Sequence, residues 1–169
     1  MILITRPIES SKKLQATFKK LGLDSYIKSL TSIVINKKQY YFESEDIYIV
    51  TSQYAVKFLK LQKNFNKKLL KFKFLVIGHS TASKLISIGA HNILFIAENS
   101  KTLLKHIKQK KYSKNFTYIC GSNHNHDFVN DLAKDKKKLK FREAYKVLSN
   151  KALLKKILNE LEKEKIKII

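Results

Sequence analysis

The chain of 169 residues is long enough for one ordinary domain, or two small ones, with a buried core. Hydrophobic residues make up 44% of it and aromatic residues 11%, which excludes a disordered chain. The single cysteine, Cys120, excludes an internal disulfide, and no apolar run reaches the roughly 18 residues that a membrane span needs. Since MILITRPIES also lacks the features of a secretory signal, we expect a cytoplasmic protein without a membrane partner.

The formal net charge is +22, and nearly all of it comes from lysine, since Arg6 and Arg142 are the only arginines. Proteins that grip phosphates or read bases favour the planar arginine fork, so a solvated lysine surface is the better interpretation. We therefore expect no nucleic-acid partner. A basic nucleic-acid-binding module stays open as an alternative, and its best candidate cluster is Lys37, Lys38, Tyr40, Tyr41 and Phe42.

Short apolar runs alternate with segments of helical periodicity along the chain. Strands are predicted at residues 2–4, 26–27, 32–35, 47–50, 74–77, 93–96, 116–120, 144–148 and 166–169. Helices are predicted at residues 14–21, 53–61, 81–88, 101–107, 127–133 and 153–161, with Gly22 and Gly89 as stop signals. This alternation predicts an α/β fold with parallel sheets and right-handed crossovers.

Small polar residues follow four of the predicted strands. They are Thr51-Ser52, His79-Ser80-Thr81, Asn99-Ser100 and Gly121-Ser122-Asn123. Such residues are favoured helix caps, and ligands of parallel sheets bind at this same edge. Helix N-termini gathered there also offer N–H groups to anions, so the pattern indicates a site for a negatively charged ligand.

Two sharper chemical motifs fail on their details. The stretch around Ser80 is one residue from the G-x-S-x-G elbow of serine hydrolases, but it has Ala82 in place of the last glycine. Downstream of it, Glu98 is the only acid that precedes a histidine in the required order. In CGSNHNHDF, the C-x3-H-x-H spacing of Cys120, His124 and His126 matches no common zinc site. We therefore expect a helix cap and a polar loop, and no metal.

Five stretches in the correct order resemble the uroporphyrinogen-III synthase family. They are LITRP (3–7) with the helix after it, DIYIVTSQYAV (46–56), VIGHSTASKLISIG (76–89), YICGSN (118–123) and REAYKV (142–147). The third is the most specific match. It resembles the family's element Val-Gly-x-x-Thr-Ala-x-x-Leu-x-x-x-Gly, with Gly78, Thr81, Ala82, Leu85 and Gly89 at the matching positions.

The resemblance implies two flavodoxin- or Rossmann-like parallel-sheet domains, with the second inserted into the first. Domain one would be residues 1–36 plus 143–169 and domain two residues 37–141, joined by a two-stranded hinge near residues 32–41 and 139–145. The family's last strand–helix elements have no counterpart here. We therefore expect an incomplete first domain and a C-terminally shortened chain with impaired activity.

The resemblance also implies a cofactor-free hydro-lyase of haem biosynthesis. Such an enzyme cyclises hydroxymethylbilane with inversion of its last ring to give uroporphyrinogen III and water, and we expect a monomer. Tyr145 matches the tyrosine of the return strand and is the catalytic candidate; a packing role at the hinge is the alternative. The expected substrate-binding residues are Arg6, Thr51, Ser52, Tyr54, Ser80, Thr81, Gly121, Ser122 and Asn123. A non-catalytic remnant that binds a tetrapyrrole is the other alternative.

Overall fold

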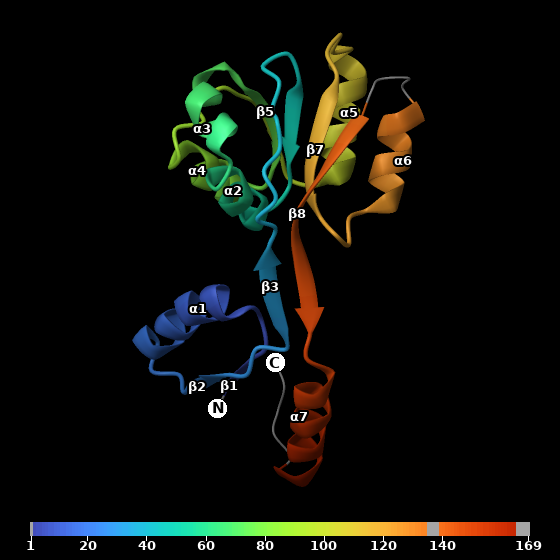
Figure 1. Ribbon diagram of the computed structural model, residues 1–169. Helices are drawn as coiled ribbons and strands as arrows, with labels where there is room; N and C mark the ends of the chain where they lie inside the picture. The colour runs from blue at the N-terminus through green and yellow to red at the C-terminus, as the bar shows by residue number, and fades with distance from the viewer. Residues whose placement is uncertain (1, 135–138, 165–169) are drawn as a thin grey trace. The chain divides into compact units, whose positions relative to one another are not determined.

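The computed structural model describes residues 2–134 and 139–164, which belong to two compact units (Figure 1). One unit comes from residues 1–34 and 147–169, the other from residues 35–146. The chain passes from one unit to the other within β3 (Thr31–Ile35) and again within β8 (Leu139–Ser149). The predicted division into domains near residues 36 and 142 stays a prediction.

One sheet has six strands in the order β3-β8-β7-β4-β5-β6, and its strands β7, β4, β5 and β6 lie wholly within the larger unit. These four strands are β4 (Ile47–Val50), β5 (Lys73–Ile77), β6 (Ile93–Ala97) and β7 (Phe116–Gly121). β4 pairs in parallel with both β5 and β7, and the outer pairs β5–β6 and β7–β8 are parallel too. Counted from β4, the parallel strands therefore follow the Rossmann order 3-2-1-4-5, whose switch point lies between β4 and β7.

Helices cover both faces of this sheet (Figure 1). On one face lie α2 (Gln53–Lys60), α3 (Lys63–Lys68) and α4 (His79–Ile86), and on the other α5 (Ser100–Lys110) and α6 (His126–Lys134). All four residues of β4 are buried, and they alternate between the two cores: Tyr48 and Val50 face α2 and α4, Ile47 and Ile49 face α5 and α6. Burial of each such side chain contributes about 1.5–3 kcal/mol.

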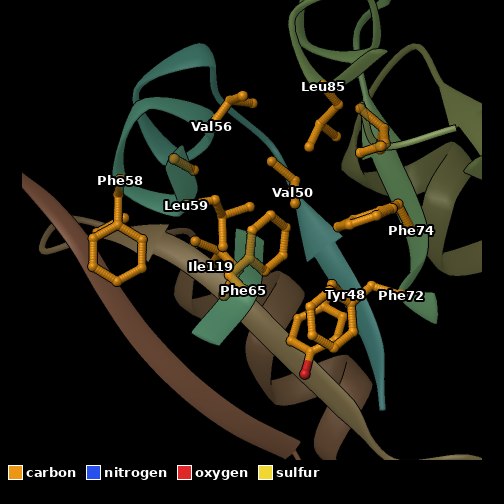
Figure 2. Packing of buried hydrophobic residues seen from close by; sticks show 14 of the residues in the cluster. Tyr48, Val50, Val56, Phe58, Leu59, Phe65, Phe72, Phe74, Leu85 and Ile119 are labelled. Atoms are coloured by element: carbon orange, nitrogen blue, oxygen red, sulfur yellow. The ribbon is translucent and has the colours of Figure 1, made fainter. Parts of the chain in front are cut away.

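The sequence pattern missed α3 and the short 3-10 helix that follows it, Leu69–Lys71. The stretch has no helical repeat of apolar residues, and its order comes from tertiary packing. Figure 2 shows Phe65 and Phe72 in the core beside Tyr48; the rings of the two phenylalanines stack with centroids 5.0 Å apart. Phe42 belongs to the same cluster: its ring centroid lies 5.4 Å from that of Phe65, and its side chain is 1% exposed. Phe42 is therefore a core residue and unable to stack on a nucleic-acid base.

The smaller unit holds a two-stranded parallel sheet of β1 (Ile2–Ile4) and β2 (Ser25–Ile27). α1 (Ile8–Lys20) connects these strands and ends at a turn where Gly22 has φ of +70°, a conformation that favours glycine. α7 (Lys151–Glu164) follows β8, and its Glu160 pairs with Lys28. The predicted strand 166–169 lies outside the described residues. None of the helices within the described ranges is both long and apolar enough to cross a membrane.

A buried charge network lies at the start of β4. The Thr117 hydroxyl donates to the Asp46 carboxylate at 2.7 Å, and the Lys140 ammonium lies 3.2 Å from the same oxygen, Oδ2. Asp46 is only 2% exposed. A carboxylate so far from water depends on its cation, because an uncompensated buried charge is costly.

Replacing Lys140 with methionine should therefore lower the free energy of unfolding by about 3 kcal/mol. This value is the lower end of the range for removing one partner from a buried ion pair. Denaturant unfolding measures this change. Lys134→Met, which removes the cation of the exposed Lys134–Asp131 pair, is the matched control and should have little effect. Equal losses in the two variants would contradict a structural role for the Asp46 network.

His106 of α5 is half-buried between Phe95 and Tyr112. Its ring stacks on Phe95 with centroids 3.8 Å apart, and its Nε2 is 2.9 Å from the Tyr112 hydroxyl oxygen. Burial, and to a lesser extent the charge of Lys110, lower the pKa of His106 below its ordinary value of 6.5. The folded state thus favours the neutral ring.

Because the pKa of His106 is lower in the folded state than in the unfolded state, its contribution to the free energy of unfolding should be complete above pH 6.5. This contribution should be lost as the pH falls below 6.5 and passes through the lower pKa of the folded state. His106→Gln, which cannot titrate, should flatten this part of the pH dependence. Denaturant unfolding at pH values from about 7.5 to 5 tests this. His91→Gln, at an exposed position, is the control, and its free energy of unfolding should depend on pH as in the wild type. If His106→Gln also kept the wild-type pH dependence, His106 would be excluded as its source.

Candidate functional site

A hollow of about 300 Å³ lies within the larger unit, at the carboxyl ends of its parallel strands. Thr51 follows β4, Ile77 ends β5, Tyr118 and Gly121 belong to β7, and Tyr145 belongs to β8. The other lining residues come from the starts of α5 and α6 and the loop before α6: Ser100, Asn123, His124, Asn125 and Phe128. The hollow therefore includes both sides of the switch point between β4 and β7, where ligands of such sheets bind.

Four of the predicted site residues line this hollow: Thr51, Gly121, Asn123 and Tyr145. Gly121 and Tyr145 belong to β7 and β8, whereas Thr51 and Asn123 lie in the loops that follow β4 and β7. The parallel register brings the ends of these strands together, and this topology is the reason the sequence pattern indicated Thr51, Gly121 and Asn123. Tyr145 was expected from the resemblance alone. Their binding and catalytic roles stay predictions.

Three further predicted residues lie next to the hollow without lining it. The Ser52 hydroxyl accepts the Tyr54 N–H at 3.1 Å and so caps α2. The Tyr54 ring packs beside the Tyr145 ring, with centroids 5.5 Å apart. The Ser122 N–H donates to the Tyr145 carbonyl at 2.9 Å, which ties the loop after β7 to β8.

The remaining three predicted residues are outside the hollow. Gly78, with φ of +85°, precedes α4, whose first turn carries Ser80 and Thr81. Ser80 is exposed, whereas Thr81 is 4% exposed. Arg6 is an exposed residue of the smaller unit, just before α1, and its carbonyl accepts the Ser11 hydroxyl at 2.8 Å.

Tyr145 is held against a glycine. The pairing of β7 with β8 shifts between Cys120 and Gly121, so that Cys120 pairs with Glu143 but Gly121 pairs with Tyr145. A Cβ atom on Gly121 would lie only 2.9 Å from two ring carbons of Tyr145. The absence of a side chain at position 121 therefore permits this placement of the ring.

Sequence reasoning missed Tyr118 as a residue of this hollow. Tyr118 is 4% exposed, and its hydroxyl oxygen is 3.4 Å from Thr51 Oγ1. Burial raises the pKa of this phenol, so the hydroxyl keeps its proton. In YICGSN an inward-facing tyrosine of a buried strand is indistinguishable from a core aromatic, and only its proximity to Thr51 reveals the difference.

The lining is polar and includes one imidazole, that of His124. None of its residues, all of them described, is Asp, Glu, Lys or Arg. Two asparagines fix the helix starts beside it: Asn99 Oδ1 accepts the Thr102 N–H and Asn125 Oδ1 accepts the Phe128 N–H, both at 3.0 Å. Neutral donors and helix N-termini in a chain of net charge +22 suit a carboxylate ligand better than a cation.

The loop CGSNHNHDF does not assemble a metal site. Within residues 2–134 and 139–164, no three His, Cys, Asp or Glu side chains are grouped as metal ligands. The rings of His124 and His126 lie 4.8 Å apart, while Cys120 is buried in the core under α5 and α6. Burial, with a smaller effect of Glu143, raises the pKa of the Cys120 thiol to about 11.

Comparison with known proteins gives both a family and a fold. The model of the family described as uroporphyrinogen-III synthase HemD matches residues 12–169. No curated protein sequence matches the chain.

Solved structures of uroporphyrinogen III synthases share the fold. For a mutant of the Thermus thermophilus protein, the TM-score is 0.66 at 13% identity, covering 96% of this chain and 68% of that one. For the Helicobacter pylori protein, the TM-score is 0.54 at 16% identity, covering 75% of this chain and 57% of that one. The family match extends from the first helix through the whole of the larger unit and beyond, and the chain therefore belongs to the uroporphyrinogen-III synthase family.

Proposed function

We propose that this chain cyclises hydroxymethylbilane, with inversion of its last ring, to give uroporphyrinogen III and water. The observation that carries the proposal is the hollow at the switch point. It is lined by Tyr145 together with hydroxyl and amide groups near the strand ends and the starts of α5 and α6. Family membership supports this choice of reaction. The predicted domains, residues 1–36 with 143–169 and residues 37–141, are part of this proposal.

The ligand class agrees with the lining. Hydroxymethylbilane carries eight carboxylates on acetate and propionate arms, and the hollow offers hydroxyl, amide and imidazole groups without a competing carboxylate among its lining residues. A volume of about 300 Å³ is at the lower limit of small-molecule sites, so this hollow would take one substituted pyrrole ring of the substrate rather than all four. The basic surface would draw the polyanion toward it.

The chemistry requires a proton near the departing hydroxyl. Protonation lets that group leave as water and gives a cationic azafulvene; attack by the substituted carbon of the last ring forms a spiro intermediate. The spiro carbon then loses its bond to the original methylene bridge, which leaves a second azafulvene. That methylene bonds to the unsubstituted carbon of the same ring, and this carbon releases a proton that balances the one consumed. Tyr145 is the proposed donor to the departing hydroxyl. Its position against Gly121, with its carbonyl bonded to Ser122 N–H, supports a fixed geometry.

Replacing Tyr145 with phenylalanine should lower kcat by about a hundredfold, the lower range for loss of a general acid, with little change in thermal stability. The measurement is the ratio of III to I isomers formed from hydroxymethylbilane, because the I isomer is the spontaneous product. Tyr41→Phe, at a position 60% exposed, is the control and should keep the wild-type ratio.

Only the I isomer from the wild-type chain would disprove catalysis. In that case, fluorescence titration with uroporphyrin distinguishes two possibilities. A non-catalytic remnant that binds tetrapyrroles would bind uroporphyrin, and a chain without either function would not.

The contact between Gly121 and Tyr145 can be tested by a double-mutant cycle. Gly121→Ala should destabilise the wild-type protein because the new methyl group overlaps the Tyr145 ring, and the cost should disappear in a Tyr145→Ala background. We expect a coupling free energy of about 1–2 kcal/mol from denaturant unfolding of the four proteins. Equal costs of Gly121→Ala in both backgrounds would show that the ring is not held by this glycine.

A further inference from the structure

Tyr118 has the structure of a fixed hydrogen-bond donor. Three aromatic rings surround its own at ring-centroid distances of 5.6 Å (Phe128), 6.2 Å (Phe141) and 6.4 Å (His124), all at steep interplanar angles. Edge-to-face packing of this kind restricts the ring. Tyr118 also lines the hollow, and its hydroxyl oxygen is 3.4 Å from Oγ1 of Thr51, another lining residue.

The hydroxyls of Tyr118 and Thr51 together have one more donor proton than their mutual contact can use. Each hydroxyl carries one donor proton, and the contact between Tyr118 and Thr51 uses at most one of the two. That contact is 3.4 Å long, well beyond the usual O–H···O range of about 2.5–3.0 Å, so it is weak. The second proton is available to an acceptor in the hollow.

The acceptor that fits is an anion. The lining offers no carboxylate side chain among its described residues, so the pair has no acidic group of the protein to bind. Burial of the phenol favours its neutral, proton-donating form, which does not repel a carboxylate. A buried site built to hydrogen-bond a polar group also discriminates strongly against ligands that lack it.

From these observations we infer that Tyr118, together with Thr51, binds one carboxylate arm of the tetrapyrrole and is a specificity-determining residue of this site. The inference rests on the proposed function for the nature of the ligand. It assigns Tyr118 a binding role distinct from the proton transfer proposed for Tyr145. The ring packing of Tyr118 is independent of that role, because Phe would retain every ring contact.

The test uses Tyr118→Phe, which removes one oxygen atom and keeps the ring. We expect its KM for hydroxymethylbilane and its Kd for uroporphyrin III to rise about tenfold or more, as for loss of a hydrogen bond to a charged group. We expect kcat and the thermal midpoint to change little, since neither the proton donor nor the core packing is altered. A loss of stability without a change in Kd would assign Tyr118 a purely structural role and overturn the inference.

Tyr112→Phe is the matched control. It removes a half-buried phenol oxygen that contacts His106 Nε2 at 2.9 Å, away from the residues of the hollow, so KM and Kd should stay at wild-type values. Thr51→Val provides a second arm that does not depend on the folding of Tyr118→Phe. If the two hydroxyls share one carboxylate, the double variant should lose less affinity than the product of the two single losses.

The outcomes separate this inference from the proposed function. Wild-type isomer ratio, KM and uroporphyrin III affinity in both Tyr118→Phe and Thr51→Val would overturn the inference and leave the proposed function intact. A wild-type chain that neither forms the III isomer nor binds uroporphyrin III would overturn both.

Discussion

The parallel pairing of β4 with β5 on one side and β7 on the other is the constraint on which the site depends. β4 is buried on both faces, so its register is fixed by two cores at once, Tyr48 and Val50 in one and Ile47 and Ile49 in the other. Because the chain continues outward from β4 in both directions, the helices after β4 and β7 leave the sheet on opposite faces. The space between their starts is where the hollow forms.

A chain so rich in lysine has a hollow without lysine or arginine among its lining residues, and the two features have different physical roles. Long-range attraction by many exposed lysines acts on any polyanion and weakens with salt. Recognition at short range depends instead on donors of fixed position, here hydroxyls, amides and helix starts held by Asn99 and Asn125. Neutral donors can be buried without the desolvation cost of a charge, which permits a closely packed site in an otherwise basic protein.

Features of this protein that depend on residues close together in sequence could be predicted, whereas features that depend on residues far apart in sequence could not. Strands and helices with a clear period, such as β4 and α2, were predicted nearly to the residue because their pattern is local. The strand ends Thr51 and Gly121 were found because parallel topology implies their proximity. α3 was missed since its helix depends on distant rings, and Tyr118 was missed since its role depends on Thr51, 67 residues away in sequence.

The irregular pairing between β7 and β8 makes the site sensitive to chain length at one point. The strand β8 contains one residue more than β7 over this stretch, because Cys120 pairs with Glu143 and Gly121 with Tyr145, which leaves Ala144 as the additional residue. In a regular ladder Gly121 would face Ala144, and the phenol would move to a different position along the edge. Deletion of a single codon here would preserve most of the sheet yet remove the proposed acid from its hollow. A one-residue gap at this position would therefore displace the phenol even if every core residue stayed unchanged.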